Sequence, residues 1–583
     1  MNKEEHFNKS KMVIYQMLPR LFGNTNQTFK KYGTIEENGC GKFNDITDTA
    51  LEEIKKLGVT HIYYTGVLRH ATCTDYENYG ILNNNPLVVK GRAGSPFAVT
   101  DYFDINPDLA VDVDARMEEF HALIKRTHEN GLKAIIDFVP NHVAREYKSK
   151  RKPSGVKDLG EGDNETKHFL PQNNFYYLPG QSFVVPEQIF NYEYIKELKG
   201  KSYKENPAKA TGNNIFKPNP DIEDWYETIK LNYGVDYQDN EKKHFDHIPD
   251  TWVKMKDILL FWASQNIDGF RCDTVELVPA EFWEYAINEI RKKYPNIVFI
   301  AEIFNPEVYS QFIEQCGFDY LYDKEIFYLT MREVLLDGSS ARELSSCWKK
   351  VNGYEEKMLR FIENHDEQRI ASQYFTGNPR KGLPAMVVAA TMGKGPVMLY
   401  SGQETGEPAE KAEGFSNDDG RTTIFDYWAI PQHQKWMNNG QFDGGLLNET
   451  EQDLRNRYNL ILNLCHHPVI ADGEFYDLMW YNKDNSSFDG RYIYTFLRYK
   501  NREALLIVVN FNAEKQFRIN INFPNELIEL IDINYNFTLF GQDVMPGKKA
   551  FTCDYKEVFD DGLFLILEPL ATHVFQLEFD PWK

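Results

Sequence analysis

The segment Gly269-Phe270-Arg271-Cys272-Asp273 decides the fold, because a short apolar strand ends here in a basic and an acidic side chain. Arg271 and Asp273 are two positions apart, so in an extended strand both side chains point to the same face. A guanidinium beside a carboxylate keeps the carboxylate ionised and oriented, as a carboxylate nucleophile requires. The five residues alone also fit a structural ion pair, and three further strand ends decide between these interpretations.

Three other short apolar runs also end in polar side chains. They are Ala134–Val139, which contains Asp137 and leads into Asn141 and His142; Val298–Ile303, which contains Glu302; and Leu359–His365, which leads into Asp366. Each run is mostly apolar and alternates little, as expected of strands buried on both faces of a parallel sheet. Four polar strand ends of this kind indicate a shared functional site rather than unrelated ion pairs.

Eight such runs alternate with helical patterns along the chain. The runs are Val13–Leu18, His61–Val67, Ala134–Val139, Gly269–Asp273, Val298–Ile303, Phe318–Tyr322, Leu359–His365 and Val397–Tyr400. Apolar residues recur at helical spacing between them, as at Ala50, Leu51, Ile54 and Leu57, at Met117, Phe120, Ile124 and Thr127, and at Met255, Leu259 and Trp262. This alternation predicts an α/β fold, a (β/α)₈ TIM barrel, in which the carboxyl ends of the strands meet at one site.

Two segments depart from the alternation and predict further domains. Residues 143–221 lack periodicity and are too long for an ordinary connection, yet they are rich in aromatic residues. We expect a small domain inserted there after the third strand; the alternative is an irregular surface loop. Short alternating strands predict a C-terminal all-β sandwich over residues 470–583. Residues 1–142 and 222–469 then form the barrel.

The four polar strand ends resemble, in order and spacing, the four short motifs of the α-amylase family of glycoside hydrolases. Gly395–Glu404 resembles the eighth-strand segment of that family, and Ser95–Tyr102 resembles the segment that carries a stacking aromatic residue. The resemblance extends over nearly the whole chain. It implies a retaining enzyme active on α-glucans, with residues 143–221 as the small domain that walls one side of the cleft.

The resemblance also implies a role for each site residue. Asp273 would be the nucleophile, Glu302 the general acid/base, and Asp366 the third carboxylate, which holds sugar hydroxyls. The implied substrate-binding residues are Arg271, which orients Asp273; His142 and His365, which bind hydroxyls of the sugar at the cleavage point; Asp137, which holds the first motif together; and Phe97, which stacks on the sugar where many members have Tyr.

Glycosidic cleavage itself needs two carboxyl groups with different protonation states. We expect Asp273 to be ionised beside Arg271, and Glu302 to have a raised pKa among apolar residues and other carboxylates. The leading hypothesis is hydrolysis of α-1,4-glucans of the starch and maltodextrin type. One alternative is transglycosylation, by a glucanotransferase or a sugar-isomerising synthase, with the same residues. A non-catalytic barrel subunit is disfavoured, because the chain keeps all three carboxylates and has no anchor.

Composition agrees with a neutral glycan as the partner. The net charge is −22 and no Lys/Arg block occurs, which argues against nucleic acid. No apolar stretch approaches the length of a membrane span. The N-terminus has no apolar signal region and the seven cysteines show no metal spacing, so we expect a cytoplasmic protein with reduced thiols. The alternative is an exported protein from which the signal has been removed.

The chemistry requires no cofactor, and a structural Ca²⁺ is left open by the sequence. Many relatives carry a Lys-His pair three and four residues after the nucleophile, which helps form the acceptor side and a calcium site. Glu276 and Leu277 stand at these positions here. Asn141 and Asp221 could still supply oxygen ligands, but no Asp-rich ligand spacing is present.

Overall fold

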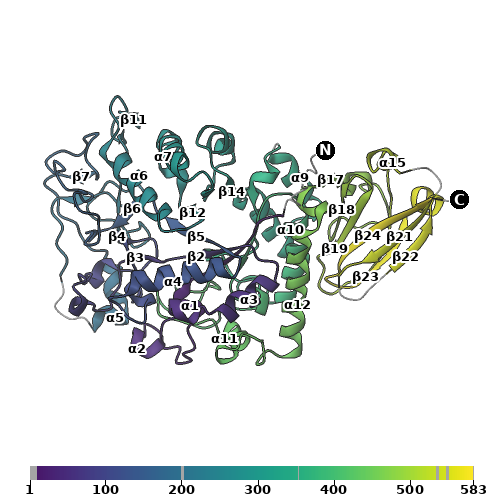
Figure 1. Cartoon of the computed structure of the whole chain (residues 1–583), viewed down its shortest axis with the longest axis horizontal. Helices are drawn as coiled ribbons and strands as arrows, with labels where there is room; N and C mark the ends of the chain where they lie inside the picture. The colour runs from purple at the N-terminus through teal and green to yellow at the C-terminus, as the bar shows by residue number, and fades with distance from the viewer. Residues whose placement is uncertain (1–9, 198–201, 352, 534–536, 546–549, 582–583) are drawn as a thin grey trace.

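Eight parallel strands form a barrel in the computed structural model of the chain, which describes residues 10–197, 202–351, 353–533, 537–545 and 550–581 (Figure 1). The strands are β1 Val13–Met17, β2 His61–Tyr64, β5 Lys133–Phe138, β12 Gly269–Cys272, β13 Val298–Ala301, β14 Tyr320–Tyr322, β15 Met358–Leu359 and β16 Val397–Tyr400. Their order in the sheet is β15-β14-β13-β12-β5-β2-β1-β16. A parallel bridge between Arg360 and Val397 brings the two edges together, so the predicted (β/α)₈ barrel is confirmed.

The strands read as continuous apolar runs because both of their faces are buried. Ile14, Ile135 and Met398 belong to a small cluster that fills the inside of the barrel. Their chain neighbours Ile136 and Leu399 belong instead to the large cluster shared with the surrounding helices. Successive side chains of a strand point to opposite faces, so every position meets an apolar environment.

Helices surround the barrel, and three of them lie where the sequence shows apolar residues at helical spacing. The helices are α1 Pro19–Phe22, α2 Ile35–Asn38, α3 Asp48–Lys56, α4 Arg116–Glu129, α6 Asp250–Ala263, α7 Ala280–Lys293, α8 Leu329–Leu335, α9 Glu343–Lys350, α10 Gly382–Thr391, α11 Pro431–Met437 and α12 Glu449–Asn463. Gly58 and Gly131, just beyond α3 and α4, have φ of 87° and 71°. Glycine adopts this left-handed conformation without a Cβ penalty, which explains why both helices end there.

Two excursions of the chain add short antiparallel pairs beside the barrel. Between β2 and α4, β3 Leu68–His70 pairs with β4 Val99–Ile105. Between β5 and α6, β6 His142–Ala144 pairs with β9 Thr228–Lys230, β7 Tyr177–Leu178 with β8 Ala208–Lys209, and β10 Val235–Asp236 with β11 Lys242–Lys243; α5 spans Glu193–Lys196. The segment predicted as an inserted domain, residues 143–221, lies within the second excursion.

The C-terminal part of the chain forms antiparallel sheets at one end of the long axis (Figure 1, yellow). One sheet has the order β17-β18-β19-β24-β21-β22 and the other pairs β20 with β23. The strands are β17 Glu474–Asp477, β18 Ile493–Lys500, β19 Glu503–Asn510, β20 Phe517–Ile521, β21 Phe537–Asp543, β22 Ala550–Asp554, β23 Leu563–Leu567 and β24 Thr572–Pro581, with α13 Pro468–Asp472, α14 Leu478–Tyr481 and α15 Glu526–Leu530. The prediction of a C-terminal all-β domain is therefore confirmed.

The seventh barrel strand is shorter than predicted. The expected run Leu359–His365 contributes only its first residues, because β15 is Met358–Leu359 and the last barrel pairing is that of Arg360. Beyond it the Asn364 side chain accepts a hydrogen bond from the backbone N–H of Asp366, 2.9 Å away, which bends the chain. Beyond its last barrel pairing, the segment therefore leaves the sheet and forms a loop at the site.

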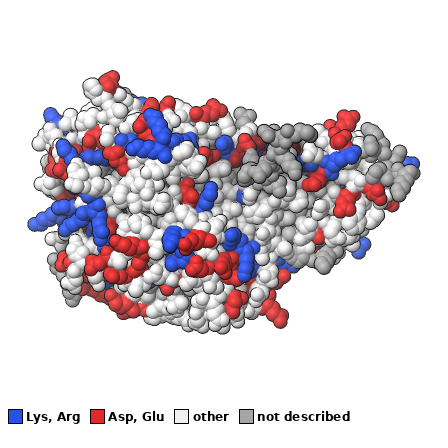
Figure 2. Space-filling view, in the orientation of Figure 1, with Lys and Arg blue, Asp and Glu red and all other residues white. Residues whose placement is uncertain are grey.

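The surface agrees with an acidic protein that carries scattered basic residues. On the face in Figure 2, Lys and Arg side chains lie among Asp and Glu side chains and form no continuous stripe. Within the ranges that the structure describes, no helix is long and apolar enough to cross a bilayer.

Candidate active site

A cavity of about 480 Å³ lies at the carboxyl ends of the barrel strands. Five of the residues proposed from the sequence line it: Phe97, His142, Asp273, Glu302 and Asp366. Further lining residues are Lys90, Ser95, Asn213, Trp225, Glu227, Thr228, Thr274, Glu276, Leu277, Phe304, Lys324, Ile424 and Phe425. The structure thus brings together five proposed residues that span 269 positions of the sequence, from Phe97 to Asp366.

The buried Arg271 guanidinium joins the two central carboxylates. Its Nη1 lies 2.8 Å from Asp273 Oδ1 and its Nη2 lies 2.7 Å from Glu302 Oε1. Cys272 pairs with Ala301 in the parallel register of β12 and β13, so the residues that follow them, Asp273 and Glu302, leave the sheet side by side. One planar guanidinium therefore contacts an oxygen of each carboxyl group.

Thr274 makes a second link between these carboxylates. Its backbone N–H donates to Glu302 Oε2 at 3.0 Å and its hydroxyl donates to Asp273 Oδ2 at 3.1 Å. This geometry requires a left-handed backbone, with φ 42° and ψ 50°, which a β-branched residue rarely adopts. Conformations of this kind cluster at functional sites, where the surroundings hold them in place.

Burial separates Glu302 from an ordinary carboxyl group. Burial raises the pKa of Glu302 to about 8; Arg271 opposes this shift, while the charges of Asp273 and Asp366 add to it. Glu302 is therefore protonated at neutral pH, the state in which a carboxyl group can donate a proton. The expectation of a raised pKa at this position agrees with the structure.

The pKa of Asp366 is shifted in the opposite direction. Burial acts to raise the pKa of Asp366, but His365 and Arg271, followed by Lys324, outweigh it, so the pKa lies below its ordinary value. The Asp366 side chain is 40% exposed and opens to the cavity. An ionised, accessible carboxylate at this place can accept hydrogen bonds from sugar hydroxyls.

His365 lies beneath Phe97, with the ring centroids 5.2 Å apart and the planes 30° from parallel. The Gln16 amide donates to His365 Nδ1 at 2.8 Å, so the imidazole proton lies on Nε2, which is 3.2 Å from Asp366 Oδ2. Burial lowers the pKa of His365, which keeps the ring neutral. The Arg271 guanidinium lies 5.3 Å from the Phe97 centroid and supports the same ring.

Asp137 lies behind the cavity rather than in its wall. It accepts hydrogen bonds from the Tyr63 hydroxyl and from the backbone N–H of Gly66, and its Oδ1 is 3.5 Å from Arg271 Nη1. Burial raises its pKa to about 6, against the field of Arg271. Asp137 therefore fixes the guanidinium that holds the two catalytic candidates.

His142 is held by its chain neighbour. The Asn141 amide donates to His142 Nδ1 at 3.1 Å, which leaves the Nε2–H free to donate into the cavity. Burial lowers the pKa of His142, so the ring is a neutral donor. The Trp225 ring packs against it, with centroids 5.3 Å apart.

The model of the α-amylase catalytic domain matches residues 16–439, which is most of the barrel and its insertions. This chain belongs to the α-amylase family. Among curated relatives, α-amylase 3 of Dictyoglomus thermophilum is 23% identical over 74% of this chain and 77% of its own length. An α-1,4-glucan:maltose-1-phosphate maltosyltransferase of Cereibacter sphaeroides is 26% identical over 36% of each chain.

Solved structures of α-amylases have the same fold over nearly their whole length. The maltogenic α-amylase AmyB of Thermotoga neapolitana superimposes with a TM-score of 0.60 and 18% identity, covering 99% of this chain and 100% of its own. The α-amylase of Geobacillus thermoleovorans, solved with acarbose, gives a TM-score of 0.60 and 16% identity over 99% of both chains.

Sequence reasoning did not identify two aromatic residues of this amylase-family cavity, Trp225 and Phe304. Glu276, named from the sequence only as a replacement in the Lys-His pair, also lines the cavity, and its carboxylate accepts from the backbone N–H of Asn305 at 3.0 Å. Phe304 stands two positions after Glu302, and this strand-like spacing could have indicated that both side chains point to the same face. Trp225 carries no such signal, because it lies just before β9, outside every predicted strand and helix, and the pairing of β6 with β9 brings it to the cavity.

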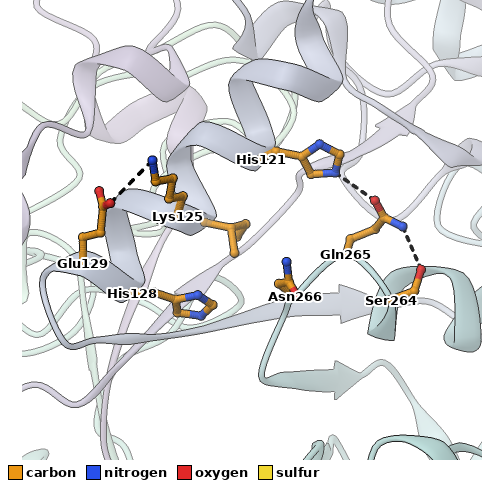
Figure 3. A pocket seen from close by; sticks show the side chains of 8 residues that line it. His121, Lys125, His128, Glu129, Ser264, Gln265 and Asn266 are labelled. Atoms are coloured by element: carbon orange, nitrogen blue, oxygen red, sulfur yellow. Dashed lines mark hydrogen bonds and ion pairs between the residues drawn. The ribbon is translucent and has the colours of Figure 1, made fainter.

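A second, larger hollow is not part of this site. It measures about 610 Å³ and is lined by His121, Ile124, Lys125, His128, Glu129, Ser264, Gln265 and Asn266 (Figure 3). His121 contacts Gln265 at 2.9 Å, and His128 is 2.8 Å from Asp268, which precedes β12. The hollow lies at the amino end of that strand, away from the carboxylates, and its side chains tie α4 to the barrel.

Proposed function

We propose that this chain is a retaining glycoside hydrolase that cleaves α-1,4-glucosidic bonds in starch and maltodextrins. The observation that carries the proposal is the Arg271 guanidinium, which holds Asp273 and Glu302 on two nitrogens of one group at the wall of a sugar-sized cavity. Retaining enzymes place such carboxyl groups about 5–5.5 Å apart and form a covalent intermediate. Asp273 would act as nucleophile and Glu302 as acid/base.

In the first step Glu302 gives its proton to the glycosidic oxygen as the bond from that oxygen to the anomeric carbon breaks. An Asp273 oxygen forms the new bond to the anomeric carbon, and the leaving sugar departs with its new hydroxyl. In the second step Glu302, now ionised, takes a proton from water, whose oxygen replaces Asp273. Asp366 and the Nε2–H of His142 would hold hydroxyls of the sugar ring, and Phe97 would pack against its face.

Maltodextrins are the favoured substrate class because relatives of this chain bind or act on α-glucans. Solved structures similar to this chain include one α-amylase in complex with acarbose and one protein, AmyP, in complex with maltose. The cavity also joins an aromatic face at Phe97 to carboxylate acceptors, and sugar rings present both apolar faces and hydroxyl donors. Neither step of the proposed reaction needs a cofactor.

Maltoheptaose tests the proposal directly. The native chain should release new reducing ends, and NMR of the first product should show the α-anomer. Glu302→Gln should lower kcat about 10³-fold on maltoheptaose, because the substitution removes the proton donor. On α-maltosyl fluoride, whose leaving group needs no proton, the loss in the first step should be far smaller. Full activity of Glu302→Gln on maltoheptaose would refute the assignment.

Transglycosylation is the second candidate function, because residues on the acceptor side of the cavity could bind a second sugar. Leu277 and Glu276 replace the Lys-His pair of many relatives, and Trp225 and Phe304 offer ring faces to a second sugar. Maltosyltransferases also occur among the relatives. If transfer dominates, maltoheptaose will disproportionate into longer and shorter chains while the number of reducing ends stays constant.

A further inference from the structure

A buried lysine contacts the turn that carries Glu276 and Leu277, the positions where many relatives have the Lys-His pair that helps form a calcium site. Lys230 is 2% exposed and lies on β9, directly opposite His142 of β6. Its Nζ donates to Asn141 Oδ1 and, at 3.0 Å, to the backbone carbonyl of Leu277. One amino group thus joins three segments: the end of the second excursion, the exit of β5, and the 3₁₀ turn Val275–Leu277 after the nucleophile.

The residues around Lys230 do not suit a calcium ion. Ca²⁺ takes six to eight oxygen ligands, usually with carboxylates among them. Here Asn141 Oδ1 and the Leu277 carbonyl accept from the lysine, and the Tyr237 ring packs against it with its centroid 5.6 Å from Nζ. Asp221, the other ligand considered from the sequence, instead accepts from Gln188 at 3.0 Å on the surface. Throughout the part of the chain with described positions, no cluster of three or more His, Cys, Asp or Glu could hold a metal.

We propose that the Lys230 amino group takes the place of a bridging Ca²⁺ in this chain and positions His142 for substrate. The link to His142 runs through Asn141. Because Lys230 donates to Oδ1, the Asn141 amide nitrogen must point the other way, where it donates to the Gly212 carbonyl at 2.8 Å and to His142 Nδ1. Lys230 thereby fixes both the rotamer of Asn141 and the tautomer of His142.

The crosslink does not depend on the charge of the lysine. Burial lowers the pKa of Lys230 to about 7, with a small opposing effect from Glu241. An ammonium carries three N–H donors and a neutral amine carries two, and two are enough for Asn141 and Leu277. Lys230 is a positioning residue, since its partners are the backbone and a side chain behind the cavity wall.

The wild-type chain alone can test whether Lys230 takes the place of a calcium ion. Thermal melting after treatment with EGTA, and again after addition of excess Ca²⁺, should give the same Tm, and calorimetric titration with CaCl₂ should give no binding heat. A rise of Tm with Ca²⁺ that is lost in Asn141→Ala would overturn the proposal, because a metal would then hold the oxygen assigned to Lys230.

Lys230→Met tests the positioning half, with Lys11→Met as the matched control. Lys11 is equally buried and donates to two backbone carbonyls, of Ala390 at 2.7 Å and Gly393 at 2.9 Å, but it lies far from the cavity. Limited proteolysis should cut residues 143–221 about tenfold faster in Lys230→Met, which is the effect of one lost buried hydrogen bond. Lys11→Met should not accelerate these cuts selectively.

The measurement specific to His142 is which of its two ring nitrogens carries the proton. In ¹⁵N-histidine spectra, with the His142 signal assigned by its absence in His142→Gln, the wild type and Lys11→Met should show a protonated Nε2. Lys230→Met should show a mixture of tautomers. Unchanged cuts and an unchanged His142 signal in Lys230→Met would overturn the proposal. These measurements use no glucan, so their outcome is independent of the proposed hydrolase activity.

Discussion

At the scale of single residues, the site depends on carboxyl groups in different protonation states. Burial raises the pKa of Glu302 to about 8, while the net field of His365 and Arg271 lowers that of Asp366 despite burial. These shifts follow from the neighbours of each group, because the charges of Asp273 and Asp366 add to burial at Glu302, whereas His365 and Arg271 outweigh burial at Asp366. A proton donor and a hydroxyl acceptor can therefore coexist in one small space.

The pH profile should report this difference. An acid whose pKa is raised keeps its proton below that pKa, so kcat/KM on maltoheptaose should be constant through neutral pH and fall tenfold per pH unit above about 8. With α-maltosyl fluoride the alkaline fall should vanish, since the fluoride leaves without a proton. Initial rates measured on both substrates between about pH 5 and 10 check this prediction.

An alkaline fall of equal size on both substrates would contradict the role of Glu302. It would point instead to another titrating group that both substrates need. The comparison therefore separates the proton donor from a group that acts on both substrates alike.

At the scale of single elements, the turn after β12 carries the strain of the site. Thr274 adopts a left-handed backbone so that its N–H reaches Glu302 and its hydroxyl reaches Asp273. Thr274→Ser keeps both donors and should keep kcat within about twofold. Thr274→Gly keeps the backbone donor, relieves the unfavourable φ and loses the hydroxyl, so kcat should fall about fivefold, the effect of one hydrogen bond.

Steady-state kinetics and thermal melting of the two variants check this prediction. If glycine matches serine in kcat, the hydroxyl bond to Asp273 does not contribute to the reaction. If serine loses as much as glycine, the methyl group of Thr274 and not its hydroxyl is what the site requires.

The elements that the sequence predicts well are those whose signal is local. Strand ends such as Arg271–Asp273 and the buried runs before them carry their own pattern, so the barrel and its catalytic candidates follow from the sequence. The seventh strand was predicted too long, because an apolar run continues as a site loop once Asn364 bends it. Lys230 and Trp225 could not be found, since their roles arise only when β9 pairs with β6.

At the scale of the whole molecule, a buried arginine joins the barrel to the C-terminal sheets. Arg498, on β18, is 1% exposed and donates to the carbonyls of Thr391 at 2.5 Å, Gly473 at 2.6 Å and Ile470 at 3.0 Å. Thr391 ends α10 of the barrel, and the other two precede β17. The hydrophobic core is likewise continuous from Val13 of β1 to Leu577 of β24.

Arg498→Met should therefore weaken the junction while leaving the cavity intact. The substitution keeps an apolar stem but leaves buried carbonyls without a donor, at a cost of about 3 kcal/mol of unfolding free energy. Because the two parts then lose their shared anchor, thermal unfolding followed by circular dichroism should broaden or split into two steps. Arg502→Met is the control: Arg502 is 65% exposed and pairs with Asp532 at the surface, so its loss should cost less than about 0.5 kcal/mol. Equal melting curves for the two variants would mean that apolar packing alone holds the C-terminal sheets to the barrel.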